Sequence, residues 1–304
     1  MAASTINLPL PKQQKTRRIR LIKYTKLNRS LKGDIGVYIM LILFGAFMAL
    51  PLIFVISTAF KPFDELFIFP PRFFVRNPTL SNFTELFNIM TGTLVPFTRY
   101  VFNTFFITTV GTFFHIMFAS LAAYALSKIA FPGREFLFRL VVLSLMFSGA
   151  VTAIPGFMIM SRLGWVDTYF ALIVPAVQAS LGLYLMKQFM EQLIPDSLLE
   201  AARIDGYNEF GIFTKIVMPL VKPAWLTLAI LTIQSLWNAT GGVFIYSEQL
   251  KTLPVAMSQI VATGVGRAGA GAAIALLMMI VPITVFIAAQ SRILETMATS
   301  GMKD

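Results

Sequence analysis

The sequence predicts an all-α membrane protein whose chain crosses the bilayer six times. The first reason is composition: 57% of the residues are hydrophobic and only 13% are charged, whereas soluble domains carry about 25% charged residues. The second reason is the length of the uncharged runs, since a spanning helix needs about 20 apolar residues. Residues 36–58 contain no charge, and 13 of these 23 residues are Leu, Ile, Val or Phe, which favours insertion by roughly 4 to 8 kcal/mol.

Six apolar segments are expected to span the bilayer, and in chain order they are 36–58, 100–126, 140–160, 168–186, 224–246 and 271–290. A short polar turn, 161–167, separates the third from the fourth. Several spans contain proline, which membrane helices tolerate because neighbouring helices and hydroxyls satisfy the freed backbone groups. His115 is the one ionisable residue well inside a span, and no predicted span contains a carboxylate. An uncharged histidine there is expected to donate a hydrogen bond to a neighbouring helix, and the missing carboxylate argues against a proton-driven carrier.

Lys and Arg predict the orientation and the division of the chain. With the N-terminus inside, the inner segments carry 18 of the 25 basic residues and the outer segments carry 7, as the positive-inside rule requires. Nine of the 18 lie in the N-terminal tail, so the bias depends on that tail. We expect a basic cytoplasmic tail at 1–35 and one six-span domain at 36–304. That domain includes a cytoplasmic loop at 190–219 and a short cytoplasmic tail at 291–304.

Charge and motif content exclude several classes of function. The formal net charge of +11 resides in the tail, which is typical of a segment facing anionic membrane lipid rather than nucleic acid. The chain has no cysteine and one histidine, so neither disulfides nor a metal cluster is expected. It has no G-x-x-x-x-G-K-[ST] motif, so no ATP site is expected on this chain. No catalytic residue set is found, and an enzyme is not expected.

The loop 190–219 is polar although it lies between two apolar spans. Its candidate functional residues are Glu200, Ala201, Ala202, Asp205, Gly206, Ile216 and Pro219. A helix is expected to begin near Pro195, with Ser197 and Glu200 as an S-x-x-E capping box, and to stop at Gly206. A second short helix is expected from Asn208 towards Thr214. The alternative is a helix that merely lies on the membrane surface.

The spacing of this loop resembles the EAA loop of ABC importer permeases, E-A-A-x3-G-x9-I-x-L-P, with Met218 in place of the usual Leu. Segments 57–62, 123–134 and 163–169, together with Trp237-Asn238, are similar to those of the carbohydrate-importer, MalG-like family. The ending at 294–303 resembles the LplC/YtcP branch, which is associated with oligosaccharides or polysaccharide fragments. The resemblance implies a six-helix type I importer fold (MetI-like) with the loop as a cytoplasmic coupling helix.

The resemblance also implies partners. These are a second homologous permease subunit, two ATPase subunits that bind ATP with Mg, and an extracytoplasmic solute-binding protein. The coupling helix would dock on an ATPase, and Gly301 and Lys303 in the C-terminal tail are candidate ATPase contacts. The chain would be a multi-pass protein of the cell membrane with both termini in the cytoplasm. The alternatives are a permease of the same superfamily for another solute and a secondary carrier.

Four polar or aromatic residues in the spans are candidates for the translocation pathway: Tyr184, Gln178, Trp237 and Asn238. Aromatic faces and amides are the groups that hold neutral sugars. Hydrogen bonding between helices is the alternative role for each of them, since polar side chains often join membrane helices.

Overall fold

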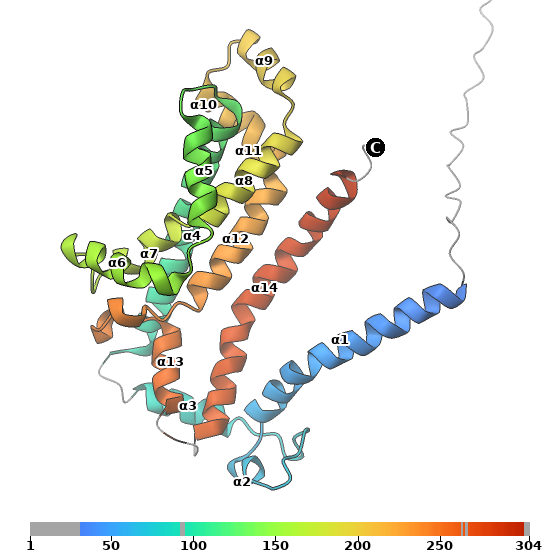
Figure 1. The fold of residues 1–304 in the computed structure, drawn as a ribbon. Helices are drawn as coiled ribbons and strands as arrows, with labels where there is room; N and C mark the ends of the chain where they lie inside the picture. The colour runs from blue at the N-terminus through green and yellow to red at the C-terminus, as the bar shows by residue number, and fades with distance from the viewer. Residues whose placement is uncertain (1–30, 92–94, 263, 265–266, 301–304) are drawn as a thin grey trace, which may run out of the picture. The chain divides into compact units, whose positions relative to one another are not determined.

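The computed structural model describes residues 31–91, 95–262, 264 and 267–300, and these residues form helices and loops without a strand (Figure 1). The all-α prediction is therefore confirmed. Most of the predicted basic tail and the two candidate ATPase contacts, Gly301 and Lys303, lie outside the described residues. The contacts within the chain divide it into two compact units, Met1–Leu50 and Pro51–Asp304. The described part of the first unit belongs to one apolar helix, α1 (Leu31–Ala59), whose last turns belong to the second unit.

Four helical segments are long and apolar enough to cross a membrane. The first two are Gly33–Ala59 in α1 and the whole of α4 (Phe97–Lys128). The third, Phe170–Leu193, comprises α7 (Phe170–Val177) and α8 (Ser180–Leu193). The fourth is Ala268–Gln290 in α14 (Ala268–Ser300). Two bent helix pairs raise the number to six if each pair is one span. All six predicted segments therefore fall on helices of the described chain.

The third predicted span, 140–160, is not one straight helix. Its residues belong to α5 (Arg134–Ser144) and α6 (Gly149–Arg162), which are bent by 110° relative to each other. The break coincides with Ser148, whose backbone is extended at φ −74° and ψ 150°, and with the following glycine. Serine and glycine are weak helix formers, and a count of apolar residues does not register them as a break.

The fifth predicted span, 224–246, is helical only as far as Trp237. Helix α12 (Lys222–Trp237) ends there, and Gly241 and Gly242 follow with φ of 72° and 50°. These left-handed conformations suit glycine and cannot continue a right-handed helix. The remaining residues form a 3-10 turn, Gly242–Phe244. The apolar run was thus longer than the helix that it predicted.

Helix α4 is the centre of the second unit, and α7, α8 and α12 pack around it. His115 on α4 donates from Nδ1 to the carbonyl of Val177 (3.1 Å), where the chain breaks between α7 and α8. This confirms the expected hydrogen bond to a neighbouring helix. The approach is so close that a Cβ added to Gly182 would lie 2.2 Å from His115 Nε2. A glycine at 182 is therefore what allows α8 to lie against α4.

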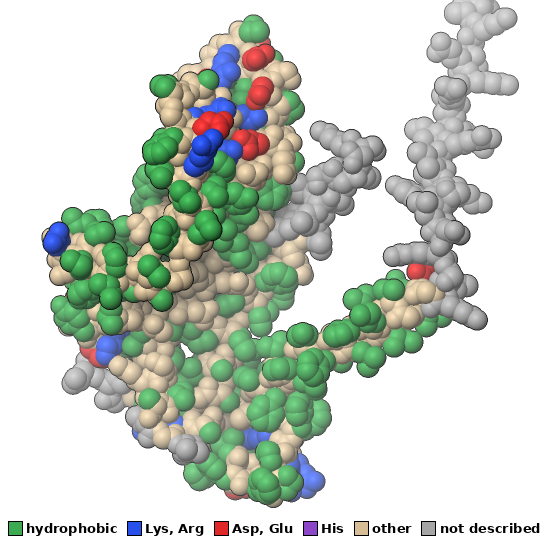
Figure 2. All heavy atoms as spheres, viewed as in Figure 1, with side chains coloured by type: hydrophobic (Ala, Val, Ile, Leu, Met, Phe, Trp, Pro, Cys, Tyr) green, Lys and Arg blue, Asp and Glu red, His purple; other side chains and the backbone are tan. Residues whose placement is uncertain are grey.

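The two ends of this bundle carry different elements (Figure 1). One end carries α9 (Asp196–Ile204), α10 (Glu209–Ile212) and α11 (Met218–Leu220). The other carries α3 (Ser81–Thr91), α13 (Leu253–Ala262) and the first turns of α14, with α2 (Phe63–Leu66) nearby. Figure 2 shows charged side chains gathered over the α9 end and a largely apolar band beneath them, as expected of a bundle whose middle faces lipid.

At the α13 end, α4 is fastened to the loop that precedes α13. Asn103 is fully buried, and its Nδ2 donates to the carbonyls of Gln249 (2.8 Å) and Lys251 (2.9 Å). Its Oδ1 accepts from the hydroxyl of Tyr169 (2.8 Å), and Thr104 Oγ1 accepts from the backbone N–H of Leu253 (2.7 Å). The first turns of α4 therefore determine where this loop lies.

Asp167 fastens the turn between α6 and α7 to the same region. Its carboxylate accepts from the backbone N–H groups of Tyr246 (3.1 Å) and Ser247 (2.9 Å) and from the Ser247 hydroxyl. Although partial burial raises the pKa of the Asp167 carboxyl, these hydrogen bonds outweigh it and hold the pKa below its ordinary value. The depressed pKa means that the carboxylate stabilises the fold above the unfolded-state pKa of about 3.9, and that this contribution disappears as the pH falls below it.

We expect Asp167→Ala to lower the free energy of unfolding by about 3 kcal/mol, since three hydrogen bonds are lost at roughly 1 kcal/mol each. Alanine also fits poorly at the left-handed φ of 59° found here, which Asp and Asn tolerate. Asp167→Asn retains an acceptor oxygen and should fall between alanine and wild type. Thermal unfolding of the purified protein measures this order. Equal melting temperatures for all three proteins would mean that the hydrogen bonds of Asp167 do not stabilise the fold.

Candidate coupling site

The helix predicted in the EAA-like loop is present as α9, and its end is as expected. Gly206 has φ 89°, and its N–H donates to the carbonyl of Arg203 (3.1 Å), while the N–H of Tyr207 donates to that of Ala202 (3.1 Å). This pair of bonds is a Schellman motif, in which a left-handed glycine ends a helix. The spacing therefore identified the correct stop.

The predicted capping box is wrong. The residue before α9 is Pro195, and no side chain caps the helix there. Pro195 sits at φ −66° and ψ 140°, and the helix begins at once with Asp196, whose carboxylate is favourable near a helix N-terminus. Ser197 is consequently already inside the first turn and does not act as the capping residue.

The second short helix is also present, with an addition. Asn208 Oδ1 accepts from the N–H of Gly211 (2.7 Å) and so caps α10. The chain then continues through a π-helical turn, Phe213–Val217, into α11. Such wide turns are uncommon and occur often at functional sites. Of the predicted loop residues here, Ile216 is half-buried and Pro219 is exposed.

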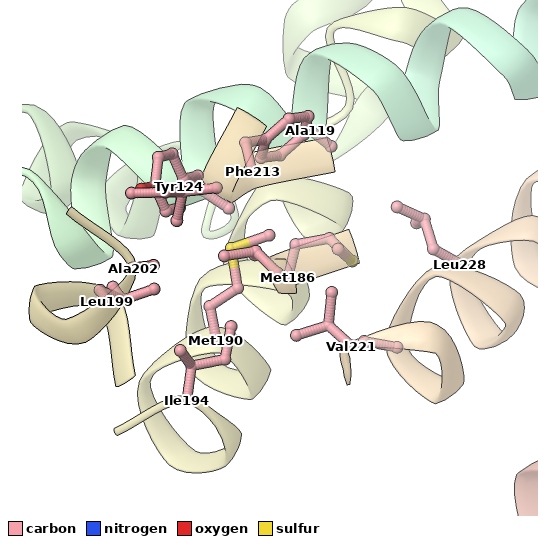
Figure 3. Close-up of a cluster of buried hydrophobic side chains, with 14 residues drawn as sticks. Ala119, Tyr124, Met186, Met190, Ile194, Leu199, Ala202, Phe213, Val221 and Leu228 are labelled. Carbon is pink, nitrogen blue, oxygen red and sulfur yellow. The ribbon is translucent and has the colours of Figure 1, made fainter. Parts of the chain in front are cut away.

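Helix α9 has one buried face. Leu199 and Ala202 are 1% and 5% exposed and pack in a cluster with Met186 and Met190 of α8 (Figure 3). Figure 3 also shows Tyr124 and Phe213 close to this face. Burying a leucine side chain contributes about 1.5–3 kcal/mol, so this contact holds α9 on the bundle and argues against a helix that only lies on a membrane.

The opposite face of α9 is exposed and partly apolar. Glu200, Ala201, Asp205 and Gly206 are exposed, and so are large apolar side chains next to them: Leu198, Ile204, Tyr207 and Phe210. Ile204 is 86% exposed. Several large apolar side chains exposed beside charged ones are typical of an interaction surface rather than of a solvated loop. Ala202 is the one member of the E-A-A triplet that faces the bundle.

Two polar contacts join this segment to the end of α4. Lys128 Nζ donates to the carbonyl of Ile194 (2.6 Å) and to Asp196 Oδ1 (2.8 Å). Tyr124 OH donates to Glu209 Oε2 (2.6 Å). The hydrogen bond and the charge of Lys128 together lower the pKa of the Asp196 carboxyl.

A third contact closes the segment on itself. Arg203 Nε donates to Glu209 Oε1 (2.7 Å), and this hydrogen bond raises the pKa of Arg203. The ion pair joins the last turn of α9 to the first turn of α10 across Gly206. Sequence reasoning did not assign Tyr124, Lys128, Arg203 or Glu209 to the coupling segment. The available signal was the spacing of Tyr124 and Lys128, which are four residues apart at the end of a span and so share one face.

Comparison with known proteins identifies the family. Residues 115–297 match the family described as binding-protein-dependent transport system inner membrane component. That range is more than half of the chain and contains the whole segment from α8 to α12. The chain belongs to this family. The permease predicted from the EAA spacing is thereby confirmed.

Individual relatives agree with this family and with its predicted branch. The permease is 34% identical over 248 residues to the polygalacturonan/rhamnogalacturonan transport system permease protein YtcP of Bacillus subtilis, covering 78% of this chain and 80% of the relative. It is 35% identical over 218 residues to protein LplC of the same organism, covering 70% of each. A solved bacterial ABC transporter involved in the import of the acidic polysaccharide alginate superimposes with a TM-score of 0.73 at 26% identity, covering 86% of this chain and 98% of that chain.

The four candidate pathway residues of the permease make separate contacts. Trp237 is buried and its Nε1 donates to the carbonyl of Met278 on α14 (3.0 Å). Asn238 donates to the carbonyl of Gln234 in its own helix (2.8 Å). The Tyr184 ring stacks on Phe138 at 6.1 Å, and Gln178 is exposed at the break between α7 and α8. Trp237 thus makes the interhelical bond that was its alternative role, and a pathway role stays a prediction for all four.

Proposed function

We propose that this permease moves a carbohydrate, an oligosaccharide or polysaccharide fragment, across the cell membrane. The observation that carries the proposal is the coupling segment: a helix held on the bundle by one face, with charged and large apolar side chains exposed away from that face. The names of the relatives support the substrate class, since YtcP is described for polygalacturonan and rhamnogalacturonan and the solved transporter for alginate. A related permease that carries another solute is the second candidate.

The proposed assembly places the permease beside a second homologous permease subunit. Two ATPase subunits bind ATP with Mg on the cytoplasmic side, and an extracytoplasmic solute-binding protein delivers the carbohydrate. Both termini of the permease lie in the cytoplasm, where Gly301 and Lys303 approach an ATPase. The basic tail faces anionic lipid of the inner leaflet. The permease performs no covalent chemistry, and its work is to couple ATP binding to a change of access.

The proposed mechanism uses α9 as the moving part. When the ATPases close on ATP, the exposed face of α9 follows the subunit on which it docks. The displacement passes into the spans through the buried face, because Leu199 and Ala202 pack tightly against α8. A closely packed interior transmits such a displacement rather than absorbing it. The pathway between the two permeases then opens to the other side.

Glu200→Lys is expected to reduce ATP-dependent uptake by at least about tenfold without loss of the folded permease. Glu200 is exposed on α9, so reversing its charge disturbs the docking surface, where a misplaced charge costs a few kcal/mol. Uptake of labelled oligosaccharide into proteoliposomes containing the complete transporter measures the effect. Glu85→Lys, the same change at an exposed position of α3, is the matched control. Wild-type uptake by the Glu200 variant would contradict the docking role.

The substrate class is tested separately with the cognate solute-binding protein. Isothermal titration against acidic and neutral oligosaccharides, an amino acid mixture and phosphate separates the two candidates. Saturable binding of an oligosaccharide supports the proposal. Binding of an amino acid or phosphate alone would overturn the carbohydrate assignment and leave the permease assignment intact.

A further inference from the structure

The last turn of α4 holds the coupling segment at two points. Tyr124 and Lys128 are four residues apart and therefore project from the same face of the helix. Lys128 reaches the beginning of α9 through Asp196, and Tyr124 reaches the beginning of α10 through Glu209, which Arg203 also binds. We call these five residues the clamp. The two points lie on opposite sides of α9 in the chain, so the whole helix lies between them.

Both α4 residues of the clamp are buried. Tyr124 is 4% exposed and its ring lies 5.6 Å from that of Phe213. The Lys128 side chain is 5% exposed, although its partner Asp196 is 79% exposed. Water screens the exposed side of that ion pair, so the carbonyl of Ile194, at 2.6 Å, is the more important anchor of the ammonium. A buried donor that lost these acceptors would be costly, which keeps the clamp closed.

The same helix is anchored at its other end. As described above, Asn103 and Thr104 hold the loop 249–253 beside α13. Helix α4 runs without interruption for 32 residues, which corresponds to about 48 Å. Helices α1, α6, α7 and α14 contain an internal proline, whereas α4 contains none. Because prolines are the usual cause of kinks, α4 is the stiff connection between the two ends of the bundle.

We propose that Tyr124 and Lys128 are positioning residues that make α9 and α4 move as one body, so that a displacement of α9 reaches the loop 249–253 at the opposite end. This inference rests on the proposed function, because an ATPase must supply the displacement. It adds a second route through α4 to the route through the packing of α9 on α8, because apolar packing by itself does not fix the direction of a contact. The polar contacts prevent sliding because they have a fixed direction and length.

The first test measures whether α9 and the end of α4 keep a constant separation. The chain has no native cysteine, so spin labels can be placed at Ala130→Cys beyond α4 and Ser197→Cys in α9, both at exposed positions. In the complete transporter, the distance distribution between the labels should be the same without nucleotide and with trapped ATP. In the Tyr124→Phe, Lys128→Met background it should change between the two states. A wild-type distance that changes as much as that of the double variant would overturn the proposal.

The second test measures coupling. In the double variant, the number of substrate molecules imported per ATP hydrolysed should fall at least about fivefold, within the usual range of allosteric coupling, while ATP hydrolysis stays within about twofold of wild type. A merely structural role would lower both together. Lys128→Arg, which retains the charge and the donors, should restore most of the ratio. Tyr246→Phe combined with Lys222→Met, the same chemical changes at two exposed residues that are not members of the clamp, is the control.

The single variant Tyr124→Phe retains the ring contact with Phe213 and therefore keeps the test valid if the double variant is unstable. An unchanged coupling ratio in a stable variant would overturn the clamp. Carbohydrate uptake by the wild-type transporter tests the proposed function. The distance between the spin labels tests whether the clamp makes α9 and α4 move together. The two failures are therefore distinguishable.

Discussion

Gly206→Pro is expected to abolish ATP-dependent uptake while the permease still inserts into the membrane. Gly206 has φ 89°, and proline is restricted to about −65°. The variant also loses the N–H that bonds to the Arg203 carbonyl. The turn between α9 and α10 must therefore rearrange, at a cost of about 3 kcal/mol or more, and α9 no longer presents its exposed face in the same direction. Insertion depends on the apolar length of the spans, which this substitution leaves unchanged.

Uptake into proteoliposomes and membrane-fraction blots measure the two parts of this prediction. Gly206→Ala provides a graded comparison, because a Cβ there would have no atom within 4 Å and the cost is only the left-handed backbone, about 1–2 kcal/mol. We expect reduced but measurable uptake for the alanine variant. Full uptake by the proline variant would show that the shape of this turn is unimportant for coupling.

Asn103→Ala is expected to have the largest effect on stability, about 3–5 kcal/mol. Asn103 is fully buried and makes three hydrogen bonds through one amide, to Gln249, Lys251 and Tyr169. Its truncation leaves two carbonyls and a hydroxyl without these partners, and each unsatisfied group costs about 1–3 kcal/mol. The loop before α13 should then detach from α4.

Thermal unfolding of the detergent-solubilised permease measures this effect, and a decrease of roughly 5 °C or more is expected. Asn238→Ala is the matched control, because that amide is exposed and donates to the carbonyl of Gln234, one turn earlier in the chain. Equal melting temperatures for the two variants would mean that the Asn103 amide does not hold the loop in place.

In the coupling segment, the spacing of residues in the sequence predicted some structural features and not others. The E-A-A triplet, Gly206 and the residues up to Pro219 located α9, its stop and the following short helix. The predicted start of α9 near Pro195 is also confirmed, and only its capping box is wrong, because the helix begins at Asp196 and Ser197 already lies inside its first turn. The ends of the spans were missed because hydropathy counts apolar residues, whereas Ser148 before α6 and Gly241 after α12 have backbone conformations that do not continue a helix.

By itself, the sequence determined the membrane class, six helical segments and the place of the coupling helix, because composition, apolar run length and glycine spacing are local properties. Only the tertiary structure decided which face of α9 is free and which side chains of α4 hold it. Tyr124 and Glu209 are 85 residues apart, and Lys128 and Asp196 are 68 apart. Such pairs form only where packing brings distant helices together, and no local pattern encodes that packing.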